Sequence, residues 1–136
     1  IVKAMAKLQS QSTSGAATFS QIAFATALSA DQTCVATMRA EFERRGAHMW
    51  LRLTAIPGVR CPKPTGAFYC FPNVSAAYAK LGVRGSIEFA ARLLEEARVA
   101  VVPGEAFGMD EHVRLSFATG MQQIDKGLDR IEKFLR

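Results

Sequence analysis

The sequence is poor in the residues that build metal centres and disulfide frameworks. It has three cysteines and two histidines among 136 residues, and no two cysteines have C-x-x-C spacing. Structural zinc sites need about four such ligands, and an odd number of cysteines cannot all be paired. We therefore expect no metal site, and we interpret Cys34, Cys61 and Cys70 as reduced thiols of a cytoplasmic protein. No spacing to His48 or His112 supports a Cys–His nucleophile.

Long hydrophobic runs are missing as well. No apolar run approaches the ~20 residues of a membrane span. The first residues, IVKAMAK, are too charged for a secretory signal. We therefore expect a cytoplasmic protein with no membrane partner. The sequence opens in the middle of a helical pattern without a methionine, which favours a fragment of a longer protein.

Positive charge is present but dispersed. The formal net charge is +5, yet Arg44-Arg45 is the only adjacent basic pair and acidic residues interleave nearly everywhere. The aromatic residues fall at apolar positions, so no platform for stacking nucleic-acid bases is formed. We expect no nucleic-acid partner. A solvated basic surface explains the charge, and small anionic substrates are compatible with it.

The composition is that of one globular domain. Hydrophobic residues make up 49% and charged residues 21% of the chain. A chain of 136 residues can bury one real core but not two. We expect a single domain over 1–136.

Apolar periodicity predicts a series of helices and strands. Helical spacing predicts helices over 1–8, 18–28 and 86–97, and a short helix or turn over 75–81. Capping-box spacing at 29–32 and 119–122 predicts the starts of a long helix to about residue 55 and of the last helix. Residues 9–15 read as a polar loop, and strands are expected over 59–61, 67–74, 99–102 and 112–118.

This order of elements predicts the fold class. Strands grouped with helices on one side indicate a two-layer α+β (α/β two-layer) unit, with a small, mostly antiparallel sheet packed against helices. Pro72 would interrupt a central ladder, so it should lie at the end of its strand or on a sheet edge.

The strand over 112–118 carries an arginine that needs explaining. Apolar and polar residues alternate strictly there, so one face meets the core and Arg114 lies on the other. A guanidinium held on a rigid strand costs desolvation unless an anion meets it. One interpretation is an internal ion pair with a nearby acid: Glu105, Asp110 or Glu111. The other is a clamp for the carboxylate or phosphate of a substrate.

Three segments together resemble the C-terminal part of class I aminotransferases, the fold-type I pyridoxal-phosphate enzymes of the aspartate aminotransferase group. The segments are LQSQSTS at 8–14, PTGAFYCFP at 64–72 and VAVVPGEAFGMDEHVRLSFAT at 99–119. Their order, spacing and flanking helices also fit. The resemblance covers essentially the whole chain and corresponds to the final third of such an enzyme. It implies that 1–136 is the C-terminal small domain, with the large cofactor-binding domain absent.

The resemblance also implies roles for particular residues. The arginine in the segment matching HVRLSF grips the α-carboxylate of the amino-acid substrate in this family, which favours the clamp interpretation for Arg114. Gly66 and Phe68 match positions near the substrate pocket, where a glycine allows close backbone approach. Gln11, Ser12 and Thr13 match a segment near the dimer interface.

The same resemblance shows what this chain lacks. Family chemistry needs a lysine in a Ser-Lys segment that forms a Schiff base with pyridoxal phosphate. None of the six lysines of the chain has that context. We therefore expect a fragment of an aminotransferase that acts on an amino acid and a 2-oxo acid, inactive and without cofactor on its own, from a homodimeric parent. The alternative is a non-enzymatic module that binds carboxylates or dimerises.

Overall fold

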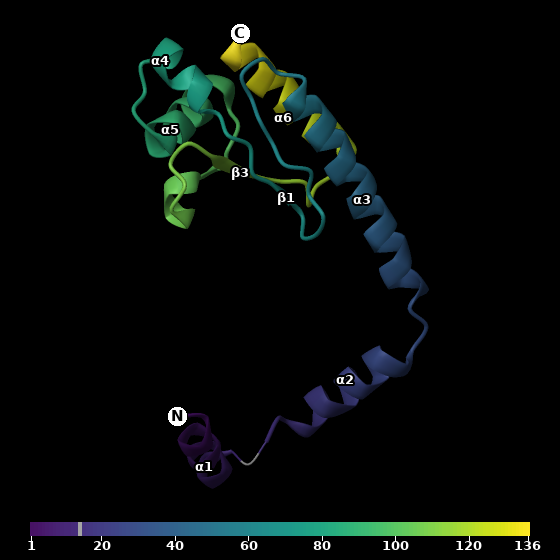
Figure 1. Ribbon diagram of the computed structural model, residues 1–136. Coiled ribbons are helices and arrows are strands. Elements are labelled where there is room, and N and C mark those ends of the chain that lie inside the picture. Colours follow the sequence, from purple (N-terminus) through teal and green to yellow (C-terminus); the bar gives the residue numbers. More distant parts are fainter. Residues whose placement is uncertain (14) are drawn as a thin grey trace. The chain divides into compact units, whose positions relative to one another are not determined.

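The computed structural model describes residues 1–13 and 15–136, and the chain divides into two compact units, 1–36 and 37–136 (Figure 1). The first unit contains α1 (Val2–Ser12) and α2 (Thr18–Ser29), and α3 (Thr33–Thr54) runs from the first unit into the second. The second unit contains β1 (Tyr69–Cys70), the 3₁₀ helix η1 (Ser75–Ala77), α4 (Tyr78–Leu81), α5 (Ser86–Ala97), β2 (Val102–Pro103), the 3₁₀ helix η2 (Gly104–Phe107), β3 (Val113–Ser116) and α6 (Met121–Leu135). The single domain expected over 1–136 stays a prediction.

The polar stretch after residue 8 is helical, so the prediction of a loop from residue 9 is wrong. α1 continues to Ser12, and the hydroxyls of Ser10 and Ser12 donate to helix carbonyls three residues earlier, at 2.8 and 3.4 Å. Ser14, which belongs to the predicted loop, lies outside the described residues. The helix predicted over 18–28 is confirmed as α2.

The first two helices bury none of their side chains. Their apolar residues are more than half exposed: Val2, Met5, Leu8, Phe19, Ile22, Phe24 and Leu28. Short helices gain most of their stability from packing an apolar face, so α1 and α2 present faces that the described chain does not cover. None of the described helices is both long and apolar enough to cross a membrane.

Both capping-box predictions are wrong. Ser29 ends α2, and its hydroxyl donates to the Ala25 carbonyl at 2.9 Å. α3 begins at Thr33, whose backbone N–H and hydroxyl donate to the Asp31 carboxylate at 3.1 and 2.7 Å. The last helix is capped by the backbone of Gly120, without a side-chain cap. Spacing alone therefore did not identify the residue that starts either helix.

The sheet is three-stranded and antiparallel, in the order β1-β3-β2. In register, Tyr69 lies opposite Ser116, Cys70 opposite Leu115, and Val102 opposite Arg114. The small antiparallel sheet with helices confirms the predicted α+β class. Pro72 lies two residues after the end of the edge strand β1, outside the ladder that its missing N–H could not join.

The strands are shorter than the apolar patterns indicate. Ala67 has a positive φ of 56°, so the strand predicted over 67–74 begins only at Tyr69. The strand predicted over 59–61 is reduced to an isolated antiparallel bridge between Arg60 and Asn73. Of the strand predicted over 99–102, only Val102 lies in a strand, as the first residue of β2.

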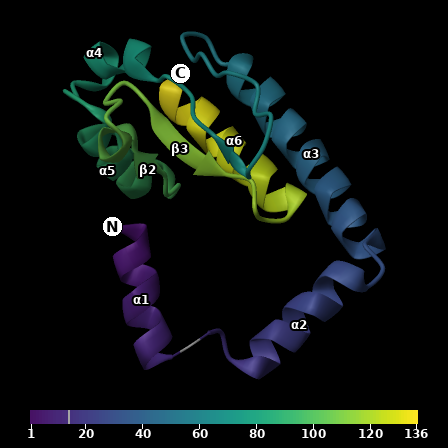
Figure 2. The ribbon, with the colours of Figure 1, turned by 60° about the horizontal axis from the view of Figure 1, so that its bottom comes forward.

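One face of this sheet joins three helices in a single core. Its buried residues include Met49 and Leu53 from α3, Phe89 and Leu93 from α5, Val113 and Leu115 from β3 with Phe117 just after it, and Ile124, Leu128 and Ile131 from α6. The ribbons of α3 and α6 run side by side (Figures 1 and 2). Gly46 lets α3 approach the sheet, because a Cβ there would lie 2.9 Å from the Phe117 ring.

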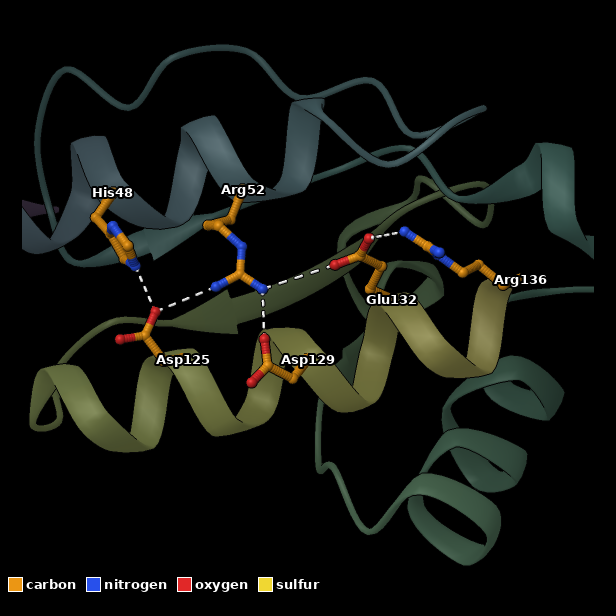
Figure 3. A network of polar contacts seen from close by, with 6 residues as sticks. All are labelled: His48, Arg52, Asp125, Asp129, Glu132 and Arg136. Atoms are coloured by element: carbon orange, nitrogen blue, oxygen red, sulfur yellow. Dashed lines mark hydrogen bonds and ion pairs between the residues drawn. The ribbon is translucent and has the colours of Figure 1, made fainter.

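Arg52 joins α3 to three acids of α6 (Figure 3). Its guanidinium lies 3.2 Å from Asp125, 2.6 Å from Asp129 and 3.7 Å from Glu132. The hydrogen bond to Asp129 is the largest cause of the raised pKa of Arg52. His48 adds a 2.6 Å contact to Asp125. The network fixes how α6, which follows β3 in sequence, lies against α3.

A second polar cluster anchors the loop between β2 and β3. The carboxylate of Asp110 accepts from the backbone N–H and hydroxyl of fully buried Ser86, at 2.8 and 2.7 Å. These hydrogen bonds lower the pKa of Asp110. The Ser86 hydroxyl also accepts from the Glu105 N–H at 3.1 Å, and the Tyr78 hydroxyl donates to the Asp110 carbonyl at 2.6 Å. Burial is the main cause that raises the pKa of Tyr78 to about 12.

Arg52→Ala should lower the free energy of unfolding of the chain by about 1 kcal/mol, because a partly buried network of several charges is worth more than one exposed pair. Denaturant titration measures this, and the effect should shrink in high salt. Arg84→Ala is the matched control, since its side chain is 90% exposed and its ion pair is with Glu88 of the same segment; it should leave the free energy of unfolding nearly unchanged. Equal losses for the two variants would contradict the role given to Arg52.

Ser86→Ala should destabilise the chain at neutral pH by about 1–3 kcal/mol, because the buried Ser86 hydroxyl both donates to the Asp110 carboxylate and accepts from the Glu105 N–H, and both hydrogen bonds are lost together. The Asp110 pKa is lowered by folding, so its contribution is complete above its ordinary value and is lost as the pH falls through the lower folded value. The difference between Ser86→Ala and the unaltered chain should therefore narrow below about pH 4. Denaturant titrations at several pH values check this, and a difference independent of pH would contradict it.

Candidate functional site

Strand β3 presents Arg114 on the side of the sheet away from the core. Val113 and Leu115 are 2% and 7% exposed, whereas Arg114 between them is half-buried and Ser116 is exposed. The predicted alternation along this strand is therefore confirmed. Because facing residues of antiparallel strands point the same way, Tyr69 and Val102 share the face of Arg114.

Two aromatic rings enclose the guanidinium of Arg114. Its Cζ atom lies 4.4 Å from the ring centre of Tyr69 in β1 and 4.7 Å from that of Phe107 in η2. Both distances are within the range of cation–π attraction. Two elements far apart in sequence, β1 and η2, thus contact the Arg114 side chain. These ring contacts limit the orientation of the guanidinium and leave its N–H donors unused.

The internal ion pair considered from the sequence is not formed. In the described part of the chain no carboxylate oxygen lies within 4.0 Å of Arg114, and no hydrogen bond to its guanidinium is seen. Asp110, one of the three acids considered as a partner, is held by Ser86 instead. The guanidinium therefore keeps its donors for a group that does not belong to the described residues.

More aromatic groups continue this surface. Phe71 packs edge-on against Phe107 at 5.8 Å and stacks on His112 at 5.0 Å with an interplanar angle of 18°. The Nδ1 atom of His112 is buried and has no hydrogen-bond partner among the described residues. Arg114 thus lies beside an apolar, ring-lined surface, on which a charge interacts more strongly than in open water.

Phe68 lies at the edge of this surface, and Gly66 precedes it by two residues. The Phe68 ring is 40% exposed and packs 4.4 Å from Tyr69, the same ring that contacts Arg114. The Phe68 carbonyl accepts from the Phe117 N–H at 2.9 Å, which ties the segment to the end of β3. Gly66 is exposed, has no positive φ, and would meet nothing within 4 Å if it carried a Cβ. Nothing inside the described chain therefore requires a glycine at this position.

Sequence reasoning did not identify Tyr69 and Phe107 as the neighbours of Arg114. Tyr69 could have been found from strand register, had the pairing of β1 with β3 been known. Phe107 depends on the turn after β2, where a Cβ on Gly104 would collide with the carbonyl oxygens of Met109 and His112. Apolar periodicity in the sequence does not predict the conformation of that turn.

The ring-lined surface is open rather than enclosed by this chain. A hollow of about 120 Å³ beside the end of β3 and another of about 490 Å³ between α5 and α6 are not lined by Arg114. No metal-binding group of three His, Cys, Asp or Glu side chains occurs among the described residues. Lys63 lies over the Trp50 ring, and Lys80 donates to the carbonyl of Leu135. Among the described residues, neither lysine contacts the rings around Arg114.

Known proteins with similar sequences are aminotransferases. The model of the family "Aminotransferase class I and II" matches residues 1–131. An aspartate aminotransferase of Geobacillus stearothermophilus is 46% identical over 135 residues, which cover 99% of this chain and 34% of that protein. The chain thus spans about a third of the length of the curated relatives it matches.

Solved structures agree with the sequence match. The aspartate aminotransferase from Rhizobium meliloti aligns with a TM-score of 0.86 and 37% identity, over 98% of this chain and 35% of that one. An aromatic aminotransferase from Pyrococcus horikoshii aligns with a TM-score of 0.82 and 38% identity, over 95% of this chain and 34% of that one. With its α+β fold matching fold-type I structures and a family model covering nearly all its residues, this chain belongs to the class I and II aminotransferases.

Proposed function

We propose that this chain is the C-terminal small domain of a pyridoxal-phosphate-dependent aminotransferase, and that Arg114 binds the α-carboxylate of its substrate. The observation that carries this proposal is the half-buried guanidinium held between Tyr69 and Phe107, with no carboxylate of the described residues within 4.0 Å. Such a fork suits a carboxylate, which can accept two parallel N–H bonds. The segment around Arg114 is also the one that resembles the carboxylate-binding segment of the family.

Two features support a larger parent protein. The chain covers about a third of its relatives. The helices α1 and α2 bury no side chain and expose large apolar residues, as expected for elements that pack on a part of the protein outside this chain. We place the missing part before residue 1, because the resemblance assigns this chain to the final third of the enzyme.

The cofactor would be held mainly by residues outside this chain. Pyridoxal phosphate, when bound, supplies an electron sink for chemistry at the substrate α-carbon. The lysine that it requires is not apparent here, since Lys63 and Lys80 make contacts elsewhere and no lysine has the Ser-Lys context. The chain alone should therefore be inactive.

What this chain contributes is orientation of the substrate. Arg114 would fix the α-carboxylate by a bidentate pair, which restricts how the rest of the amino acid enters the site. The rings of Phe68, Tyr69 and Phe107 would form an apolar wall beside it, from which water is displaced when substrate binds. Gly66 would let the backbone approach the substrate closely.

The proposed substrates are an amino acid and a 2-oxo acid. The similar structures are an aspartate aminotransferase and an aromatic aminotransferase, and their identities to this chain, 37% and 38%, are nearly equal. The comparison therefore does not favour either side chain of the substrate. We infer that Arg114 recognises the carboxylate common to these substrates. We also propose a cytoplasmic homodimeric parent, with Gln11, Ser12 and Thr13 near the interface.

A non-enzymatic carboxylate-binding or dimerisation module is the second candidate. The observation in its favour is the uncovered apolar surface of α1 and α2, which a second copy could cover. The two candidates differ in cofactor binding: only the aminotransferase predicts cofactor absorbance and a half-reaction with amino acids in the full-length protein.

Arg114→Ala in the full-length protein should raise KM for the amino acid about 10- to 100-fold, because a charge-assisted bidentate contact is lost. Cofactor absorbance should be retained, because the role proposed for Arg114 is to bind the substrate carboxylate and not the cofactor. Steady-state kinetics with visible-range spectra measure both, and Arg84→Ala, an exposed arginine, is the control that should change neither. An unchanged KM would remove Arg114 from this role, whereas no cofactor band in the unaltered full-length protein would favour the non-enzymatic module.

Gly66→Ala should leave the thermal midpoint of the full-length protein within a few degrees of the original, because its Cβ would meet open space and its φ is not positive. KM for the amino acid should nevertheless rise, since the methyl group would occupy space given to substrate. Gly127→Ala in α6 is the matched control: it also meets nothing within 4 Å, and it should stabilise the helix by about 0.5–1 kcal/mol without affecting kinetics. Unaltered kinetics in Gly66→Ala would exclude Gly66 from the substrate site.

A further inference from the structure

Two segments that each carry a cysteine run antiparallel beside the sheet. Arg60 and Asn73 form a bridge with both backbone hydrogen bonds, at 3.2 and 2.7 Å. Cys61 directly follows Arg60, and Cys70 lies in β1 three residues before Asn73. The bridge therefore holds the two cysteines near each other, although eight residues separate them in the sequence.

The two thiols meet at the edge of the core. Cys70 is 1% exposed and belongs to the core cluster, and half-buried Cys61 packs against that same cluster. The Cys61 thiol donates to the Pro62 carbonyl at 3.4 Å, and each of the two thiols shifts the pKa of the other. Cys34, the third cysteine, is exposed and belongs to the first unit. One cysteine of the pair is thus reachable from solvent and the other is shielded.

We propose that Cys61 and Cys70 are a dithiol modification site, converted to an intrachain disulfide by hydrogen peroxide and returned to two thiols by a small-molecule thiol reductant. The pairing rests on the geometry of the Arg60–Asn73 bridge and the shared core contact, and does not depend on the proposed function. Reversible disulfides in reducing compartments are typical of redox-responsive thiols.

The two cysteines have different chemical roles. The neighbouring Cys70 thiol lowers the pKa of Cys61, whereas the neighbouring Cys61 thiol and burial raise the pKa of Cys70. Cys61 therefore supplies the nucleophilic thiolate and Cys70 keeps its proton until the second step. Burial also protects Cys70 from direct attack by peroxide.

The proposed oxidation balances as follows. The Cys61 thiolate attacks one oxygen of hydrogen peroxide, an S–O bond forms as the O–O bond breaks, and the hydroxide released takes up a proton to become water. The Cys70 sulfur then attacks the sulfenic sulfur, the S–S bond forms, and a second water leaves with the Cys70 proton. The two thiols together lose two electrons and two protons, and one peroxide becomes two waters.

A Cys61–Cys70 disulfide would join the two ends of residues 61–70 into a covalent loop that contains Gly66 and Phe68. It would also join β1, which carries Tyr69, to the chain before it. The single tryptophan reports on this change, because the Trp50 indole N–H donates to the Cys61 carbonyl at 2.9 Å. Oxidation should therefore alter tryptophan fluorescence without any need for substrate or cofactor.

The test uses the full chain carrying Cys34→Ser, so that only the proposed pair remains. After treatment with hydrogen peroxide, the denatured protein is alkylated and digested with trypsin, which leaves both cysteines in one peptide, residues 61–80. We expect most of this peptide to be unalkylated and lighter by two hydrogens, at a rate independent of protein concentration. Dithiothreitol should restore two alkylated cysteines and the original fluorescence.

Single replacements complete the test. With Cys70→Ala, an apolar replacement suited to the core, Cys61 should accumulate as a sulfenic acid that dimedone traps. With Cys61→Ser, Cys70 should stay a thiol after peroxide. Peptide 61–80 with both cysteines still alkylated after peroxide would overturn the proposal, as would disulfide formation only between chains or overoxidation of Cys61 beside an intact Cys70 thiol.

Discussion

The arginine held between two aromatic rings is the constraint on which the rest of the site depends. Strand β3 fixes the direction of Arg114, while Tyr69 and Phe107 restrict its guanidinium from two sides. Cation–π attraction of this kind contributes about 0.5–2 kcal/mol. Each hydrogen bond to a charged group contributes about 1.5–3 kcal/mol, so the rings orient the guanidinium but do not replace an anion. The chain therefore presents an oriented guanidinium that has no carboxylate partner among the described residues.

The arrangement of the rings follows from how three elements meet one core. Tyr69 is positioned because β1 pairs with β3, and β3 is held by Val113 and Leu115 in the core. Phe107 is positioned by a turn that tolerates only glycine at Gly104 and is anchored through Asp110. Packing of α3, α5 and α6 supports both. A substitution in this core should therefore change the distance between the Tyr69 and Phe107 rings, and with it the orientation of the Arg114 guanidinium.

The parts predicted correctly from the sequence are those that depend on neighbouring residues. Alternation along the strand over 112–118 placed Arg114 opposite the core, and the α+β class followed from the order of elements. Features that depend on distant partners were missed. The Ser29 hydroxyl bonds back into α2 rather than capping α3, and Asp110 bonds Ser86 rather than Arg114. The rings around Arg114 come from β1 and η2, which no local pattern relates. The likeness to known aminotransferases, rather than periodicity, favoured the clamp.

The most direct test of the central claim is a crystal structure of the full-length protein with a bound dicarboxylate substrate analogue. The account predicts that the Arg114 guanidinium donates two parallel hydrogen bonds to the α-carboxylate, while Tyr69 and Phe107 remain on either side of it. A structure in which Arg114 pairs with a carboxylate of the protein, and the analogue is held by other cations, would contradict it.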